Sequence, residues 1–412
     1  MKKVLIITQN FYPEIGSAAN RITNIYQELQ SKGYKVTILT TEPSYPNRNL
    51  YNNTEFWNDK GKMSGVVRIH TKTRKYTSSI FNRLLLYLEV ALKFIIRIKK
   101  METHYDYIFV STPPIFVGLA GLFAKRKFSC KLILDVRDLW PESLLGVGVF
   151  TNKAVLKMAF TLEKILYKKA DHIIVNSEGF TSYISTKGID RNVIKFMPNS
   201  LTEQELNTSP LEPVNSKIEV IYTGNIGLAQ DISKLIDVAE ILKSHDNIVF
   251  KVIGYGYKQT ELKQVIKDKG LHNITFSKAK NRKNTLKEVA SAHIAYVSLV
   301  EESVFKKVLP GKIIDYMSMR KPIVGDVSGY AKGIIEKANC GITTENRNAE
   351  VIAQQILLLA NDKMLRKEYG QNGHRFAYEH LRWKKNINVL INMLEERNES
   401  ESMHVCMEPL HK

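Results

Sequence analysis

The feature that most constrains the fold is an alternation of short β-like runs and helical patterns, which occurs twice along the chain. The first series starts at the N-terminus, with a strand over 4–8, a loop and a helix over 18–31. The second starts near residue 217. Such alternation predicts parallel sheets covered by helices on both faces. The sequence therefore predicts an α/β protein with two Rossmann-like, doubly wound domains and a cleft between them. Ligands bind such sheets beyond the carboxyl ends of their strands.

The remaining β-like runs divide into two groups. In the first series they are 32–41, 105–112, 130–138, 170–177 and 193–199, and in the second 218–225, 248–256, 273–279, 292–299, 321–327 and 340–345. Between the groups, residues 199–216 are polar, contain two prolines and lack periodicity, which predicts a linker. We expect one Rossmann-like domain over 1–200 and a second over 201–375; the family resemblance described below implies that the first binds an acceptor and the second a donor. A C-terminal helix over about 376–398 is expected to pack back on the first domain.

Charge divides unevenly between the halves of the chain. Residues 1–200 contain 30 Lys and Arg against 15 Asp and Glu, whereas residues 201–412 contain 30 against 26. A basic half indicates an anionic partner such as nucleic acid, an acidic membrane surface or a phosphorylated ligand, although a lysine-rich surface can also have no specific partner. The three cysteines are widely spaced and lack a C-x-x-C pair. This argues against a disulfide framework or zinc site and favours the cytoplasm.

The strongly apolar segment 79–100 has basic residues on both flanks and Glu89 inside it. No stretch of the chain is long enough to predict a bilayer-spanning helix, and the N-terminus lacks the pattern of a signal peptide. A basic-edged helix with a broad apolar face can lie in a membrane interface. A core helix of the first domain is the equal alternative.

The run LDVRDLWPESL places several charged residues at the end of an expected strand. Arg137, Asp138 and Glu142 are candidates for contacting or orienting an acceptor hydroxyl, because charged groups at such an edge are costly unless solvated or functional. The alternative interpretation is structural, with Arg137 and Asp138 forming an ion pair.

Three glycine-containing turns follow expected strands and precede helices. They contain Gly16 and Ser17, then Gly224, Asn225 and Gly227, and finally Gly254 and Tyr255. Glycine lets a backbone approach a ligand closely, and the N–H groups of a helix start favour anions. No dinucleotide fingerprint or P-loop is present. Each turn alone is nonspecific, but several at one sheet edge predict a phosphate-binding edge.

The run LPGKIIDYM contains Leu309, Pro310, Gly311, Lys312 and Asp315 at an expected helix start. Gly311 gives backbone access, and Lys312 adds a positive charge to the helix dipole. Asp315 lies one turn along and can accept hydrogen bonds from ribose hydroxyls. A phosphate site and a ribose acceptor one turn apart predict a nucleoside diphosphate ligand. The alternative is an ordinary Lys–Asp pair on a helix surface.

These motifs resemble the retaining glycosyltransferases of family 4, which have the GT-B fold, over nearly the whole chain. FYPEIGSAAN resembles the family's first glycine loop, VIGYGYKQTELK its Gly-x-Gly turn, and LPGKIIDYMSMRKPIV its donor signature. DLWPESL and YTGNIGLAQDI are similar to a WbuB-like branch of O-antigen and capsule enzymes.

The resemblance implies transfer of a sugar from a UDP-sugar to a polyprenyl-diphosphate-linked acceptor, with retention. An N-acetylated deoxyhexosamine such as N-acetylfucosamine is the implied sugar. It further implies a cytoplasmic enzyme, peripheral on the inner face of the membrane, that needs no metal or other cofactor. Lys312 corresponds to the phosphate-binding lysine, Asp315 to the ribose-binding carboxylate, and Gly16 to the loop near the diphosphate.

The chain departs from the family pattern at two places. The first glutamate of the acidic motif would fall at Lys307, and Asn225 stands where an arginine is frequent. The alternatives are a sugar-nucleotide epimerase of similar fold and a non-enzymatic basic protein that binds nucleic acid or membrane. We expect no nucleic-acid binding, because the chain lacks interleaved aromatic and basic residues.

Overall fold

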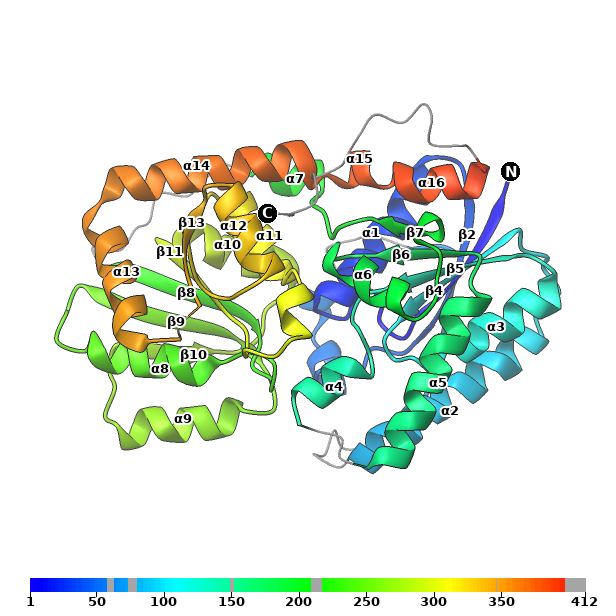
Figure 1. The fold of residues 1–412 in the computed structure, drawn as a ribbon, viewed down its shortest axis with the longest axis horizontal. Coiled ribbons are helices and arrows are strands. Elements are labelled where there is room, and N and C mark those ends of the chain that lie inside the picture. The colour runs from blue at the N-terminus through cyan, green and yellow to red at the C-terminus, as the bar shows by residue number, and fades with distance from the viewer. Residues whose placement is uncertain (58–62, 73–79, 149–151, 209–216, 346, 397–412) are drawn as a thin grey trace. The chain divides into compact units, whose positions relative to one another are not determined.

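The computed structural model describes residues 1–57, 63–72, 80–148, 152–208, 217–345 and 347–396. They form two compact units (Figure 1). Unit 1 comprises Met1–Asn199 and the described residues from Trp383 onward, and unit 2 comprises Ser200–Arg382. Cys130 and Cys340 are free thiols. None of the described helices combines the length and apolar character that a bilayer-spanning segment requires.

Unit 1 is built on a parallel sheet with the strand order β3-β2-β1-β4-β5-β6-β7. The described strands are β1 (Lys3–Ile7), β2 (Lys35–Thr41), β3 (Val66–Ile69), β4 (Tyr107–Thr112), β5 (Lys131–Val136), β6 (His172–Val175) and β7 (Ile194–Phe196). Central strand β4 pairs with both β1 and β5, and all six of its residues are buried. Such complete burial is characteristic of parallel strands covered on both faces.

Helices cover both faces of this sheet. The described helices are α1 (Ser17–Ser31), α2 (Ile80–Lys99), α3 (Val117–Phe128), α4 (Glu142–Gly146), α5 (Lys153–Lys169), α6 (Gly179–Thr186), α15 (Trp383–Asn386) and α16 (Asn388–Glu395). Figure 1 shows α1 and α16 on one side of the sheet and α2, α3 and α5 on the other. The first side is a single apolar cluster in which Ile22 and Tyr26 meet Trp383 and Leu390. The segment after Trp383 is therefore part of the core of unit 1.

Unit 2 is built on a second parallel sheet, with the order β10-β9-β8-β11-β12-β13. The described strands are β8 (Ile218–Asn225), β9 (Ile248–Tyr255), β10 (Ile274–Ser277), β11 (Ile294–Ser298), β12 (Ile323–Asp326) and β13 (Gly341–Thr344). The described helices are α7 (Glu203–Leu206), α8 (Ile232–Ile241), α9 (Gln259–Asp268), α10 (Arg282–Ser291), α11 (Gly311–Ser318), α12 (Tyr330–Lys337), α13 (Ala349–Asn361) and α14 (Lys363–His380). The two predicted parallel-sheet domains are therefore confirmed.

The structure differs from the sequence-based prediction in the two segments where the chain passes from one unit to the other. The expected linker 199–216 is folded in its first part, because Thr202 and Glu205 form a reciprocal capping box that starts α7. The Leu201 amide donates to the Leu381 carbonyl at 2.8 Å. The single helix expected over 376–398 is instead α14, which ends at His380 in unit 2, followed by α15 and α16 in unit 1. Residues 209–216 lie outside the described part of the chain.

Candidate active site

The carboxyl edge of the unit 2 sheet opens between β8 and β11. These strands pair only at Val220–Ile294 and Ile221–Ala295. Beyond those pairs, the hydroxyl of Tyr316 accepts a hydrogen bond from the Thr223 amide at 3.0 Å and donates to the Tyr296 carbonyl at 3.2 Å. Strand order reverses here, since β9 lies on one side of β8 and β11 on the other. The geometry is that of a topological switch point, with α11 anchored by Tyr316.

Lys312 lies one turn before Tyr316 on α11 and reaches the end of β8. Its Nζ is buried, has no hydrogen-bond partner among the described residues and lies 3.6 Å from the centroid of the Tyr222 ring. Desolvation lowers the pKa of Lys312 well below its usual value, although nearby Asp315 opposes this effect. A buried ammonium supported mainly by a ring face is poorly satisfied, so the arrangement is ready to accept an anionic oxygen.

The N-terminus of α11 adds to the positive electrostatic potential around Lys312. Pro310 is the N-cap and supplies no side-chain cap, and no acidic residue occupies the first turn. Leu309 is buried, whereas Gly311 is half-buried. The first amide groups of the helix therefore lie in a positive local potential, next to Lys312.

Asp315 lies on α11 but does not contact Lys312. Its carboxylate accepts a hydrogen bond from Nη2 of Arg282 at 2.9 Å, and the same guanidinium pairs with Glu205 of the capping box. Burial raises the pKa of Asp315, and Arg282 partly offsets that rise. Sequence reasoning missed Arg282 and Glu205. The T-x-x-E pattern of Thr202–Glu205 signals the cap, but nothing in the sequence indicates that Arg282 reaches it.

Most glycines of the second and third turns are required for packing within unit 2. A Cβ on Gly254 would lie 1.9 Å from the Gly224 carbonyl oxygen, so its absence lets β8 and β9 pack together. Gly224 has a φ of +115°, and its nearest side-chain neighbour is Lys312. Gly227 lies against the Asn225 amide, and Tyr255 is the last residue of β9. The edge thus brings Gly224 close to Lys312, whereas the absence of a side chain at Gly254 is required for packing.

In unit 1, the first glycine turn leads into α1. Gly16 is the N-cap of α1 with a φ of +124°, a left-handed value that favours glycine. The hydroxyl of Ser17 accepts a hydrogen bond from Nδ2 of Asn199 at 3.1 Å. The turn therefore lies at the carboxyl end of β1, as expected.

A buried network of charges occupies the carboxyl ends of β4 and β5. Arg21 pairs with Asp135 at 2.8 Å, and both side chains are almost fully buried. Ser111 donates to Asp135 at 2.7 Å and accepts from Nε of Arg137 at 2.7 Å. Burial lowers the pKa of Arg137 to about 10, with Asp135 opposing and Arg21 adding to the effect. The Arg137–Asp138 ion pair of the alternative, structural interpretation does not form; Arg137 instead donates hydrogen bonds to Ser111 and the Pro113 carbonyl.

Asp138 and Glu142 lie beside this network. Asp138 accepts a hydrogen bond from the Ser143 hydroxyl at 2.9 Å, and burial raises its pKa. Glu142 meets the hydroxyl of Tyr183 at 3.5 Å, and that hydroxyl also contacts buried Glu163. A half-buried carboxyl group with a raised pKa is suited to proton transfer, which makes Asp138 the stronger candidate of the two.

The family's first glutamate would fall at Lys307, and the acidic residues nearest to that position in the sequence are Glu301 and Glu302. Glu301 and Glu302 are exposed, and Glu301 pairs with Lys306 at 3.5 Å. A different acidic group lies at the edge of the sheet: Arg347 pairs with Asp231 and with Asp326, the last residue of β12. Burial raises the pKa of Asp326 to about 6. Within the described ranges, no cluster of three His, Cys, Asp or Glu side chains is arranged to hold a metal ion.

Comparisons with known proteins agree with this two-sheet architecture. Residues 16–200 match the family "Glycosyl transferase 4-like domain", and residues 203–376 match "Glycosyl transferases group 1". The chain belongs to the GT-B glycosyltransferases. It is therefore a transferase enzyme, and this finding sets aside the epimerase and the non-enzymatic protein.

Individual relatives are distant in sequence but similar over most of their length. WcaI of Escherichia coli (strain K12), a glycosyl transferase named for colanic acid biosynthesis, is 20% identical, covering 90% of this chain and 95% of WcaI. Sucrose-phosphate synthase from Thermosynechococcus elongatus has a TM-score of 0.73 at 14% identity and covers 96% of this chain and 99% of its own. Anabaena HepE in complex with UDP-glucose has a TM-score of 0.72 at 14% identity, with coverages of 96% and 100%.

Proposed function

We propose that this glycosyltransferase transfers a sugar from a UDP-sugar to a polyprenyl-diphosphate-linked acceptor during capsule or O-antigen synthesis, with retention of configuration. The observation that carries the donor class is Lys312, a buried ammonium without a hydrogen-bond partner in the described chain, beside the N-terminus of α11. The HepE structure with UDP-glucose and the colanic acid name of WcaI support the donor and the polysaccharide setting. An N-acetylated deoxyhexosamine such as N-acetylfucosamine is the proposed sugar.

In the proposed mechanism, the bond between the sugar and the β-phosphate breaks while the acceptor hydroxyl bonds to the same face of the sugar. The acceptor's proton passes to the departing phosphate oxygen. Lys312 and the first amides of α11 stabilise the negative charge that develops on UDP, a role that preorganised donors fill without a metal ion. Asp315 accepts hydrogen bonds from the ribose through the carboxylate that Arg282 orients.

In unit 1, we propose that Asp138 and Glu142 orient the acceptor hydroxyl. Arg137 has a more indirect role, because its guanidinium already bonds to Ser111 and Pro113. Membrane association at the inner leaflet would bring the enzyme to its lipid-linked acceptor. The exposed side chains Leu88, Leu92 and Ile96 of α2 support this part of the proposal.

The donor class is tested by thermal unfolding with a panel of nucleotides and nucleotide sugars. A ligand that binds only the folded protein raises the melting temperature by mass action. We expect a rise with UDP and with one UDP-sugar, and a loss of both shifts in Lys312→Ala. In Asp315→Ala the shifts should shrink. A rise of equal size in Lys312→Ala would remove Lys312 from the donor site, and a rise only with another nucleotide would reject UDP.

A further inference from the structure

A pocket of unit 1 lies at the edge of its sheet opposite to the candidate acceptor residues. Lys2, Asp106 and Lys131 stand at the amino ends of β1, β4 and β5, and they line this pocket of about 1220 Å³. Since the sheet is parallel, all carboxyl ends lie at the other edge. The pocket is thus separate from the Asp135 network and from the proposed acceptor residues.

The pocket combines apolar walls with a cationic rim. Leu119, Leu122 and Phe123 of α3 and Ile165 of α5 supply apolar surface. The lining also contains five cationic and two acidic side chains: Lys2, Lys125, Arg126, Lys131 and Lys169 against Asp106 and Glu396. This composition suits the headgroup and upper chain of an anionic amphiphile.

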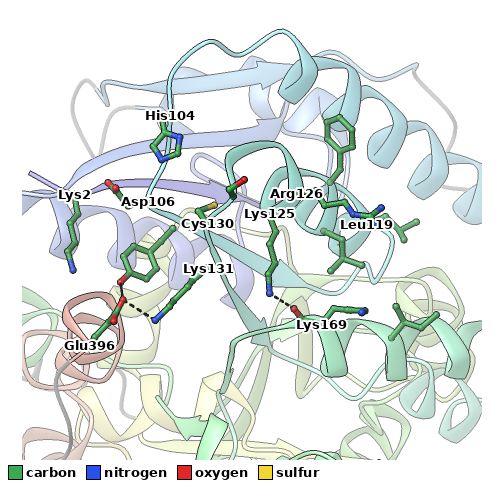
Figure 2. A pocket seen from close by; sticks show the side chains of 15 residues that line it. Lys2, His104, Asp106, Leu119, Lys125, Arg126, Cys130, Lys131, Lys169 and Glu396 are labelled. Atoms are coloured by element: carbon green, nitrogen blue, oxygen red, sulfur yellow. Dashed lines mark hydrogen bonds and ion pairs between the residues drawn. The ribbon is translucent and has the colours of Figure 1, made fainter.

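Several of the cations are already paired. Lys131 pairs with Glu396 at 2.9 Å, and Lys125 pairs with Asp171 at 2.7 Å. Arg126 and Lys169 are exposed, and their charged groups make no ion pair within the described residues. Figure 2 shows Lys125, Arg126 and Lys169 along one side of the pocket, and Lys2, Lys131 and Glu396 along the other. The side with Arg126 and Lys169 therefore carries the uncompensated charge.

The flanking helices expose large apolar side chains. On α2, Val90, Phe94 and Ile98 are buried, while Leu92 is 60% and Ile96 is 55% exposed. On α5, Met158 is 68% and Ile165 is 43% exposed. Helix α2 therefore packs one face into the core and exposes apolar side chains on the other. The side chains of 79–83 lie outside the described residues. Exposed aliphatic side chains on adjacent helices form an interaction surface.

The charge of these helices indicates which kind of partner this surface can bind. Helices α2, α3 and α5 contain twelve basic and two acidic residues, and one of the acids, Glu163, is fully buried. A second copy of the chain would bring like charges together. An acidic bilayer offers both an apolar layer for the aliphatic side chains and phosphates for the cations.

We propose that the α2–α3–α5 face docks on an acidic phospholipid bilayer, with one lipid phosphate held between Arg126 and Lys169 at the pocket. This inference deepens the membrane association proposed above. It does not depend on the donor chemistry, because unit 2 contributes no residue to the face.

The test is co-sedimentation of the full chain with vesicles of phosphatidylcholine alone or mixed with phosphatidylglycerol. We expect binding only to the mixed vesicles. Leu92→Asp and the double variant Arg126→Glu/Lys169→Glu should each bind about tenfold more weakly or worse, from lost insertion and from reversed charge. The matched controls in unit 2 are Met364→Asp and Lys363→Glu/Lys367→Glu, which make the same changes of charge at exposed side chains, and these variants should bind as the unaltered protein does.

Three results would overturn the proposal. They are equal binding to both vesicle types, equal binding by face variants and controls, and a loss of vesicle binding that merely follows protein self-association in light scattering. The melting shift with UDP should persist in Leu92→Asp and in the double variant. A failure of the membrane proposal is thereby distinguished from a failure of the donor assignment.

Discussion

Each sheet has a buried cationic group near its carboxyl edge, Arg21 in unit 1 and Nζ of Lys312 in unit 2, and the two groups have opposite surroundings. In unit 1, Arg21 and Asp135 neutralise each other at 2.8 Å, and Ser111 connects them to Arg137. In unit 2, the buried ammonium of Lys312 has the Tyr222 ring beneath it and no hydrogen-bond partner in the described chain. A buried cation that is paired within the protein cannot be removed from its partner without loss of stability. A buried cation without a hydrogen-bond partner remains available to bind an anionic ligand. The two similar sheets have thus been put to different uses.

The largest expected effect is on the stability of unit 1 and concerns the buried Arg21–Asp135 pair. Asp135→Ala leaves Arg21 buried without its carboxylate, which should lower the free energy of unfolding of unit 1 by about 3–5 kcal/mol. All three tryptophans, Trp57, Trp140 and Trp383, belong to unit 1, so their fluorescence during urea unfolding reports this unit.

The control at the same edge is Glu142→Ala. It removes one long hydrogen bond to Tyr183 and should cost about 1 kcal/mol or less. Equal losses for both variants would show that the Arg21–Asp135 pair is not what stabilises the edge.

The second prediction concerns Lys312 in unit 2, where we expect a loss of ligand affinity without a loss of stability. Lys312→Met removes a poorly satisfied charge, so the melting temperature of the free protein should stay the same or rise. Affinity for UDP should nevertheless fall by about 10- to 100-fold, the usual cost of losing a charged hydrogen bond. Calorimetric unfolding and titration measure the two quantities, with the exposed Lys337→Met as control. A destabilised variant with unchanged UDP affinity would make Lys312 structural.

The smallest expected effect concerns Arg282. Burial raises the pKa of Asp315 and Arg282 opposes that rise, so Arg282→Gln should raise this pKa further. Asp315 then protonates at higher pH and accepts ribose hydroxyls less well. We expect a loss of UDP affinity of about threefold near pH 8 that grows as the pH falls.

The measurement is the dissociation constant of UDP between pH 8.5 and pH 5.5, with Lys283→Gln as control. A parallel loss at every pH would mean that Arg282 acts without changing the ionisation of Asp315.

Much of the fold was predictable because its signals are local. Buried strands such as β4 are continuous apolar runs, and the Gly-Lys start of α11 is a short motif whose surroundings follow from the strand–helix order. Strand β3 and helix α12 were missed, since both VVRI and YAKGIIEK are too short to show a clear periodicity.

Long-range pairing could not be predicted. Arg21 meets Asp135 across 114 positions, and Arg282 meets Glu205 across 77. Sequence spacing carries no information about such contacts, so the internal ion pair between Arg21 and Asp135 was not predicted. The same limitation hid the two faces of 79–100, because core packing and exposure alternate along one helix.

The central claim is that Lys312 is held with a lowered pKa until a diphosphate binds. Its pKa in the free protein lies well below the usual value because of desolvation. A bound diphosphate would raise it, so UDP binding at a pH between the two values takes up a proton. The decisive measurement is the titration of UDP in two buffers of different ionisation enthalpy, repeated at several pH values between about 8 and 10, below the usual pKa of a lysine. We predict net proton uptake in the unaltered protein and none in Lys312→Met. Tight UDP binding with the same proton balance in both proteins would contradict the account.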